Sequence, residues 1–312
     1  MIPESWKRHY QDYALKTIGK NVITAWGVAT YPSRCLPDFL IIGAQRAGTT
    51  SLYHYLIAHP AVAPAMPSKG VHYFDTRFHE SLAWYRSHFP TVLAARYTRI
   101  RRGVDLITGE ASPYYLFHPK VPERVAEALP NVKLIVLLRD PVERAYSHYA
   151  NEVARGYEEL PFERALDREA GRLKGESEKL ETDPSYYSFA HQHYSYLARG
   201  LYLEQIVRWR SFFRRDQLQI QSAERFFADP PAVLADVHDF LGVERRPLAA
   251  YEEHNARRRE PMRQGTRELL EEFFAEPNRR LFDYLGVDFG WNRRSARTHS
   301  SLTAVAGRRG RA

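Results

Sequence analysis

A short stretch near the N-terminus constrains the fold more than any other part of the chain. The apolar run of residues 39–42 predicts a buried strand, a glycine-containing turn follows, and residues 50–59 begin a helical pattern. Gly43, Gly48 and Thr50 match the phosphate-cradling template G-x-x-x-x-G-K-[ST], but position 49 is threonine where the template has lysine. We therefore expect a P-loop-like strand, loop and helix without the lysine that binds nucleoside triphosphates.

The loop keeps the chemistry of an anion site. Backbone N–H groups of the turn and the positive end of the following helix attract phosphate or sulfate. Further donors come from the guanidinium of Arg46 and from the hydroxyls of Thr49, Thr50 and Ser51. The alternative interpretation is a plain strand-to-helix turn that needs a glycine only for its geometry.

A second strand-to-helix junction carries similar groups. Residues 132–138 are apolar except for Lys133, as expected of a central parallel strand covered on both faces, and this strand should lie beside the first. Arg139 follows at its carboxyl end, where ligands bind in open α/β sheets, and Ser147 comes two helical turns later. Two neighbouring anion sites predict a ligand with two separated phosphate-like groups. An ordinary ion pair between Arg139 and a nearby carboxylate is the alternative.

Other elements follow from local signals. Asp140, Pro141 and Glu143 predict an N-cap, a first helical position and a capping box for a helix that runs to about residue 155. Residues 104–108 predict another strand. The charge-dense residues 167–185 have weak periodicity, which favours a solvated surface loop, with a lid beside an acceptor cleft as the alternative.

Composition narrows the class of protein. A chain of 312 residues, 44% of them hydrophobic, can bury a core large enough for one α/β domain, and its net charge of +8 favours anionic partners. The single cysteine, Cys35, excludes an intramolecular disulfide and fits a reducing compartment. The first 36 residues contain no apolar signal core and no membrane span. We expect a soluble, cytoplasmic protein without a metal site.

Several motifs, in a fixed order, resemble those of sulfotransferases that use 3′-phosphoadenosine 5′-phosphosulfate (PAPS). They occupy residues 42–52, 71–75, 109–115, 119–124 and 137–147, and weaker matches continue to about residue 291. Within that family the chain is most similar to the heparan sulfate N- and 3-O-sulfotransferase type and its bacterial relatives. The resemblance implies an α/β fold with a P-loop-like parallel sheet flanked by helices. It also implies a single sulfotransferase domain over residues 37–292, an N-terminal helical extension (1–36) and a flexible basic tail (293–312).

The resemblance also implies roles for individual residues. The loop that binds the 5′-phosphosulfate would comprise Arg46, Ala47, Gly48, Thr49, Thr50 and Ser51. Arg139 and Ser147 would bind the 3′-phosphate, and Tyr202 would contact the nucleotide, although a packing role for Tyr202 is equally compatible with its position. Arg46 stands where most relatives have lysine and would stabilise charge on the departing bridging oxygen. This role is electrostatic, because an arginine donates its proton poorly.

The chain differs from its relatives at the position of the residue that serves them as general base. Glycan-sulfating relatives commonly carry a glutamate immediately before Val-His, where it deprotonates the acceptor, but this chain has Gly70. His72 is the best remaining base, because its reference pKa near 6.5 permits proton uptake around neutral pH. The alternative is a histidine that only orients the loop. Lys69 would either contact the sulfuryl oxygens or be solvated.

The predicted activity is sulfuryl transfer from PAPS to a hydroxyl or amine, with a carbohydrate or glycolipid as the expected acceptor and a small molecule as a further possibility. No metal, nucleic-acid partner or transmembrane segment is expected. Two other functions stay open: a non-catalytic nucleotide- or polyanion-binding protein, because of Gly70, and a P-loop nucleotide kinase, which would need the missing lysine and magnesium. Residues 257–259, a run of three arginines, lie where relatives close a loop over the nucleotide, and the resemblance implies a contact with the donor there.

Overall fold

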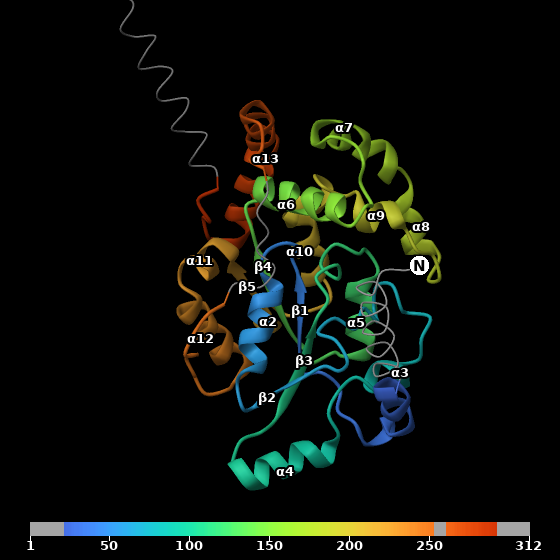
Figure 1. Cartoon of the computed structure of the whole chain (residues 1–312), viewed down its shortest axis with the longest axis vertical. Helices are drawn as coiled ribbons and strands as arrows, with labels where there is room; N and C mark the ends of the chain where they lie inside the picture. The colour runs from blue at the N-terminus through green and yellow to red at the C-terminus, as the bar shows by residue number, and fades with distance from the viewer. Residues whose placement is uncertain (1–21, 253–259, 292–312) are drawn as a thin grey trace, which may run out of the picture.

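The centre of the protein is a parallel five-stranded sheet with the strand order β2-β3-β1-β4-β5 (Figure 1). The computed structural model describes residues 22–252 and 260–291. Every neighbouring pair of strands is parallel, and β1 pairs with both β3 and β4. The strands are β1 (Phe39–Gly43), β2 (Val62–Pro64), β3 (Ile107–Ala111), β4 (Lys133–Leu138) and β5 (Leu218–Ser222). The predicted α/β class and the pairing of the first strand with residues 133–138 are confirmed.

Helices flank this sheet and extend past its carboxyl edge. In Figure 1, α2, α11 and α12 lie on one side of the sheet and α5 lies on the other. Residues 22–29 are helical. The remaining helices are η1 (Tyr31–Ser33), α2 (Thr49–Ile57), α3 (Leu82–Arg86), α4 (Val92–Arg102), α5 (Val121–Ala128), α6 (Pro141–Ala154), α7 (Phe162–Leu173), α8 (Glu176–Thr182), α9 (Phe189–His193), η2 (Ala198–Gly200), α10 (Tyr202–Arg210), η3 (Arg215–Gln217), α11 (Ala223–Ala228), α12 (Pro230–Leu241) and α13 (Gln264–Leu285).

The two central strands, β1 and β4, are buried in the core. All five residues of β1 are buried, and so is every residue of β4 after Lys133. Fully burying one large aliphatic side chain contributes about 1.5–3 kcal/mol, so these strands are held firmly. The loops that leave their carboxyl ends therefore start from a rigid base.

Strand β3 begins and ends later than the predicted strand at residues 104–108. It runs from Ile107 to Ala111 and contains Gly109 and Glu110, which read as a strand end in the sequence. A Cβ atom at Gly109 would lie 2.4 Å from the carbonyl oxygen of Phe39, so the close approach of β1 requires glycine there. Glu110 is tolerated in the sheet because its buried carboxylate receives several hydrogen bonds.

The prediction of a solvated loop at residues 167–185 is wrong. Most of this segment is helical, in the second half of α7 and in α8. Glu169 points inward and accepts hydrogen bonds from the backbone N–H groups of Leu197 and Ala198, and Leu180 is buried. One of the charged residues, Glu169, thus attaches α7 to the segment at Leu197, and the composition of the segment did not reveal this contact.

Helix α6 starts as predicted, but without the capping box. The Asp140 side chain accepts a hydrogen bond from the backbone N–H of Val142, which confirms the N-cap. The backbone N–H of Asp140 donates to Glu224 of α11 over 2.9 Å, and not to Glu143. A tertiary contact therefore replaces the local one.

Some predictions fall outside the described residues. These are most of the N-terminal extension, residues 1–21, the arginine run at 257–259, and the basic tail at 293–312. Within the described part of the chain, each helix is either too short or too polar to cross a bilayer.

Candidate functional site

The loop between β1 and α2 is shaped by one glycine. Gly48, the residue that precedes α2, has φ of +94°, in the left-handed region. A Cβ atom there would lie 2.8 Å from the ring of Phe227, so no larger residue fits without movement. The N–H groups of the first turn of an α-helix point along its axis away from the helix, and this gives the start of α2 the chemistry of an anion site.

Two residues of the site have strained backbones. Among the described non-glycine residues, only Arg46 (φ +71°) and His72 (φ +57°) have positive φ. This conformation costs on the order of 1 kcal/mol for an ordinary side chain, and such outliers cluster at functional sites. They are the two residues that the sequence predicts to be catalytic.

The guanidinium of Arg46 joins the two predicted anion sites. Its Nε donates to Ser147 Oγ over 3.1 Å, and its Nη1 donates to Asn151 Oδ1 over 3.4 Å. In return, Nη1 of Arg139 donates to the carbonyl oxygen of Arg46 over 2.9 Å. The loop after β1 and the start of α6 are therefore in direct contact. Asn151, one helical turn after Ser147, was not predicted.

Tyr202 binds the backbone of Arg139. The Tyr202 hydroxyl donates to the carbonyl oxygen of Arg139 over 2.8 Å, and its side chain is buried. Of the two roles that the sequence left open for Tyr202, its burial and its bond to the Arg139 backbone fit the packing role, and contact with the nucleotide stays a prediction. Glu143 lies 3.9 Å from Arg139 and makes its shorter ion pair, 2.7 Å, with Arg267. The contact between Arg139 and Glu143 is thus at the limit of an ion pair.

Lys69 reaches into the loop from the segment after β2. Its Nζ donates to Thr50 Oγ1 over 2.7 Å. Burial, together with repulsion from the positive charge of Arg46, lowers the pKa of Lys69 to about 8. The bond to Thr50 and the partial burial argue against a merely solvated Lys69, and its contact with the sulfuryl oxygens stays a prediction.

His72, whose side chain is 36% exposed, pairs with the buried carboxylate of Asp75. Nδ1 of His72 lies 2.9 Å from Oδ2 of Asp75, whose side chain is fully buried. Burial disfavours the charged imidazole, but the charge and hydrogen bond of Asp75 outweigh it and raise the pKa of His72. Burial likewise opposes ionisation of Asp75, but His72 lowers the pKa of that carboxyl. With Nδ1 on Asp75, Nε2 is the ring atom left to exchange a proton with a substrate.

The ring of His72 occupies the space above Gly70. A Cβ atom at Gly70 would lie 3.2 Å from Nε2 of His72 and 3.0 Å from the carbonyl oxygen of Ala111. A larger residue at position 70 would compete with the imidazole for this space. The missing side chain and the position of the histidine are therefore physically linked.

Glu110 clamps the His72 segment to the sheet. Its carboxylate accepts hydrogen bonds from the backbone N–H of Val71 (2.7 Å), from Ser112 (2.6 Å) and from the hydroxyls of Tyr85 and Tyr115, both 2.9 Å. The hydroxyl of Ser112 in turn accepts from the backbone N–H of His72 over 3.0 Å. Sequence reasoning did not assign Glu110 or Asp75 a role, although the spacing of His72 and Asp75 was a usable signal.

The carboxyl edge of the sheet thus gathers most of the predicted site residues. Ala47, Thr49 and Ser51 are buried beneath the loop surface, while Arg46 and Thr50 are partly exposed. In the parts of the chain that the structure describes, no three potential metal-ligating side chains come together.

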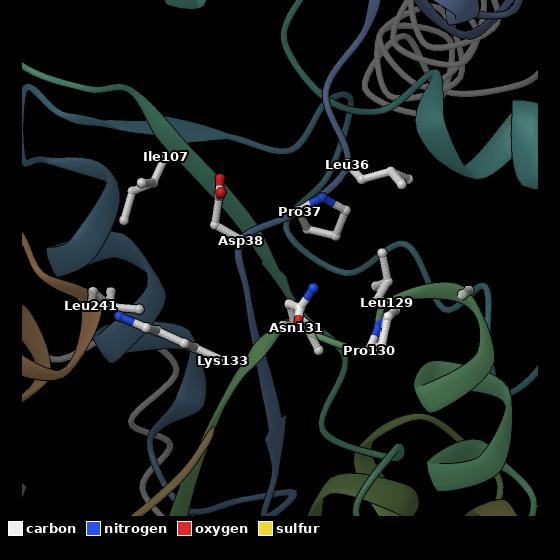
Figure 2. Close-up of a pocket in the computed structure, with 11 residues that line it drawn as sticks. Leu36, Pro37, Asp38, Ile107, Leu129, Pro130, Asn131, Lys133 and Leu241 are labelled. Carbon is white, nitrogen blue, oxygen red and sulfur yellow. The ribbon is translucent and has the colours of Figure 1, made fainter. Parts of the chain in front are cut away.

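A cavity of about 420 Å³ lies at the opposite, amino edge of the sheet (Figure 2). Lys133 and Asp38 are its charged residues, and both are already bound to backbone groups. Nζ of Lys133 donates to the carbonyl oxygen of Phe240 over 2.6 Å, and Asp38 accepts from the N–H of Thr108 over 2.8 Å. None of the predicted site residues lines this cavity, so we place the candidate site at the carboxyl edge.

Comparison with protein families gives one match that covers most of the chain. The model described as "Sulfotransferase domain" matches residues 36–274. Among solved structures, the chain is similar to a sulfotransferase from Alicyclobacillus acidocaldarius, with 29% identity and a TM-score of 0.63, over 83% of this chain and 99% of that one.

Curated relatives point in the same direction. A membrane-associated sulfotransferase of Dictyostelium discoideum is 27% identical over 82% of this chain and 67% of its own length. The mouse heparan sulfate glucosamine 3-O-sulfotransferase 3B1 is 29% identical over 83% of this chain and 66% of its own length. The chain therefore spans about two thirds of the length of these relatives.

Proposed function

The chain belongs to the sulfotransferase domain family, and from this premise we propose that it transfers a sulfuryl group from PAPS to a hydroxyl or amine of a carbohydrate. The observation that carries the proposal is the contact between Arg46 and Ser147, which joins the loop after β1 to the middle of α6. This contact supports the proposal because the side chains that we assign to the two anionic groups of the nucleotide lie side by side.

The residues present fit such a donor. Loop N–H groups at the start of α2, together with Thr49, Thr50 and Ser51, suit the 5′-phosphosulfate, and Arg139 with Ser147 suits the 3′-phosphate. The template lysine of nucleoside triphosphate sites is absent at Thr49. Three cationic side chains, those of Arg46, Lys69 and Arg139, offset the negative charge of the ligand.

When bound, PAPS supplies an activated sulfuryl group. In our proposal, Nε2 of His72 takes the proton of the acceptor hydroxyl or amine while the acceptor atom bonds to sulfur. The bond between sulfur and the bridging oxygen breaks, and adenosine 3′,5′-bisphosphate leaves with the electron pair. Arg46 and Lys69 stabilise the negative charge that develops on the leaving group and the sulfuryl oxygens.

Asp75 prepares His72 for this role. By accepting a hydrogen bond from Nδ1–H, the carboxylate fixes the tautomer in which Nε2 carries the lone pair. It also stabilises the imidazolium that forms after proton uptake. Gly70 leaves the room that the ring needs, so the imidazole takes the place of the glutamate expected from relatives.

A carbohydrate acceptor is proposed because two kinds of relatives carry it in their names. These are the heparan sulfate glucosamine 3-O-sulfotransferases and a mouse bifunctional heparan sulfate N-deacetylase/N-sulfotransferase, which is 31% identical over 67% of this chain. The positive net charge of the chain favours an anionic oligosaccharide over a neutral one. A cytoplasmic location stays a prediction.

The test is transfer of labelled sulfate from PAPS to a panel of oligosaccharides, comparing the unaltered chain with Arg46→Ala. We expect the change to lower turnover by a factor of about 100 to 1000, the usual effect of removing one charge-stabilising donor. Arg225, a surface arginine on α11 that pairs with Asp236, provides a matched control, and Arg225→Ala should leave turnover unchanged. Undiminished transfer by Arg46→Ala would contradict its role.

Binding measurements separate the alternatives. By calorimetry, adenosine 3′,5′-bisphosphate should bind in the presence of a chelator, whereas a kinase would prefer ATP with magnesium. A chain that binds the bisphosphate but transfers sulfate to no acceptor in the panel would be a nucleotide-binding protein. Gly70 is the one observation that favours that second function.

A further inference from the structure

Helix α4 carries a stripe of exposed apolar side chains. Leu93 is 71% exposed, Tyr97 is 63% exposed and Ile100 is 82% exposed. Their spacing of four and three residues places them on one face of the helix. Single exposed apolar residues are ordinary on protein surfaces, but three in a row along one helix form a patch that calls for a partner.

Arginines border this stripe on both sides. At 100° per residue, Arg96 falls on one flank of the stripe and Arg101 on the other, and both are exposed. Ala95 and Thr98, which are partly buried, lie on the opposite face, so the stripe points away from the protein body. The helix contains four arginines and no acidic residue. Arg99 forms an ion pair with the exposed Asp105 beyond the end of the helix.

A second exposed aromatic residue lies in a segment tied to the start of α4. Arg34 forms a β-bridge with Thr91, the N-cap of α4, and the N–H of Cys35 donates to the carbonyl oxygen of Pro90 over 2.8 Å. The helix at residues 22–29, just before this bridge, leaves Trp26 66% exposed. In Figure 1 this helix and α4 both lie toward the lower end of the molecule, whereas the β1 arrow points toward the upper end.

We propose that α4 docks the protein onto an anionic lipid bilayer. Leu93, Tyr97 and Ile100 enter the boundary between headgroups and acyl chains, and Arg96 and Arg101 contact lipid phosphates. An amphipathic helix with a basic border and an apolar stripe combines both contributions that hold peripheral proteins on membranes. Long arginine side chains extend along the apolar surface and keep their charges at headgroup level.

Charge distinguishes a bilayer from a second copy of the chain. Self-association through α4 would bring the flanking Arg96 and Arg101 of two copies together, and like charges at an interface oppose binding. A soluble polyanion would pair with the arginines but would leave the apolar stripe in water. Only an anionic bilayer satisfies both parts of the surface.

Docking in this way directs the candidate site away from the lipid. Helix α4 leads into the amino end of β3, whereas the site lies at the carboxyl ends of β1 and β4. On the proposed function, the acceptor then reaches the site from the aqueous side.

The experiment is co-sedimentation of the full chain with phosphatidylcholine vesicles, with and without phosphatidylserine, at low and high salt. We expect binding to the phosphatidylserine vesicles that weakens as salt rises. The double change Leu93→Ser with Ile100→Ser should lower the affinity at least about tenfold, and Arg96→Gln with Arg101→Gln should lower it by a similar factor. Leu269→Ser, at a leucine of α13 that is 69% exposed, is the matched control and should bind as the unaltered chain does.

Several results would overturn the proposal. One is absence of binding to phosphatidylserine vesicles by the full chain. Another is full binding by the Leu93 and Ile100 double variant, which would assign the affinity to basic charge alone. A third is a lipid-free dimer, seen by light scattering, that the same double variant dissociates, because the stripe would then be a contact between copies.

Discussion

Nε of Arg46 donates a hydrogen bond to Oγ of Ser147 over 3.1 Å, across 101 residues of sequence. This contact holds a backbone of positive φ in place and keeps the Arg46 guanidinium beside the predicted 3′-phosphate site. The guanidinium therefore lies where it can respond to either anionic group of the donor nucleotide.

Ser147→Ala removes both a proposed phosphate donor and the anchor of Arg46. A hydrogen bond to a charged group contributes about 1.5–3 kcal/mol, so affinity for adenosine 3′,5′-bisphosphate should fall about 10- to 100-fold. Calorimetry measures this loss directly. Asn151→Ala removes the longer 3.4 Å contact with Arg46 and a 2.8 Å hydrogen bond to Glu152, but no proposed phosphate donor, so its effect on this affinity should be smaller. Equal losses would argue against a special role for Ser147.

His72→Asn should abolish most turnover while leaving donor binding intact. General-base catalysis contributes a factor of about 100 to 10,000, and the asparagine keeps the polarity of the site without a titratable ring nitrogen. Steady-state transfer assays and calorimetry with the bisphosphate provide the two readouts. A parallel fall in donor affinity would indicate that His72 shapes the pocket and takes no proton.

Turnover should depend on pH with a rising and a falling limb. His72 acts as a base only when neutral, and its pKa is raised, so activity should rise as pH increases through a value above 6.5. Lys69 contributes its charge only when protonated, so activity should fall as pH increases through about 8. Asp75→Asn should move the rising limb to lower pH. Lys69→Arg should remove the falling limb, and a profile unchanged by both substitutions would refute these assignments.

A glutamate at position 70, as in the relatives, should restore part of the turnover to a variant that lacks the His72 imidazole. A side chain at position 70 competes with the His72 ring, so Gly70→Glu alone should lower turnover. In a His72→Ala background the same change places a carboxylate in the vacated space, and turnover should exceed that of His72→Ala. Gly70→Gln in that background is the control, since an amide has no basic oxygen. Rescue by both substitutions would mean that packing, and not proton transfer, was restored.

Glu110→Gln should destabilise the fold. The carboxylate receives four hydrogen bonds, two on each oxygen, and the amide nitrogen that replaces one oxygen cannot accept its two. Leaving buried donors unpaired costs about 1–3 kcal/mol each, so the free energy of unfolding should fall by at least about 2 kcal/mol. Urea denaturation measures this loss. A change of less than about 0.5 kcal/mol would show that the four donors find other partners.

Local patterns in the sequence determined the elements that frame the site. The apolar runs before Gly43 and Arg139 specify the two central strands, because buried parallel strands require continuous apolar residues. The left-handed turn at Gly48 and the N-cap at Asp140 are likewise readable, because each depends on the chemistry of a few adjacent residues.

Tertiary structure alone decided which distant groups meet. Five contacts join residues 19 to 101 positions apart: Arg46 with Ser147, Lys69 with Thr50, Tyr202 with Arg139, and Glu110 with both Val71 and Tyr85. The helical segments within residues 167–185, which were expected to be a loop, depend on contacts of the same kind. Such contacts arise from packing across the sheet edge, where long-range geometry sets the environment of each side chain, and no local pattern encodes that geometry.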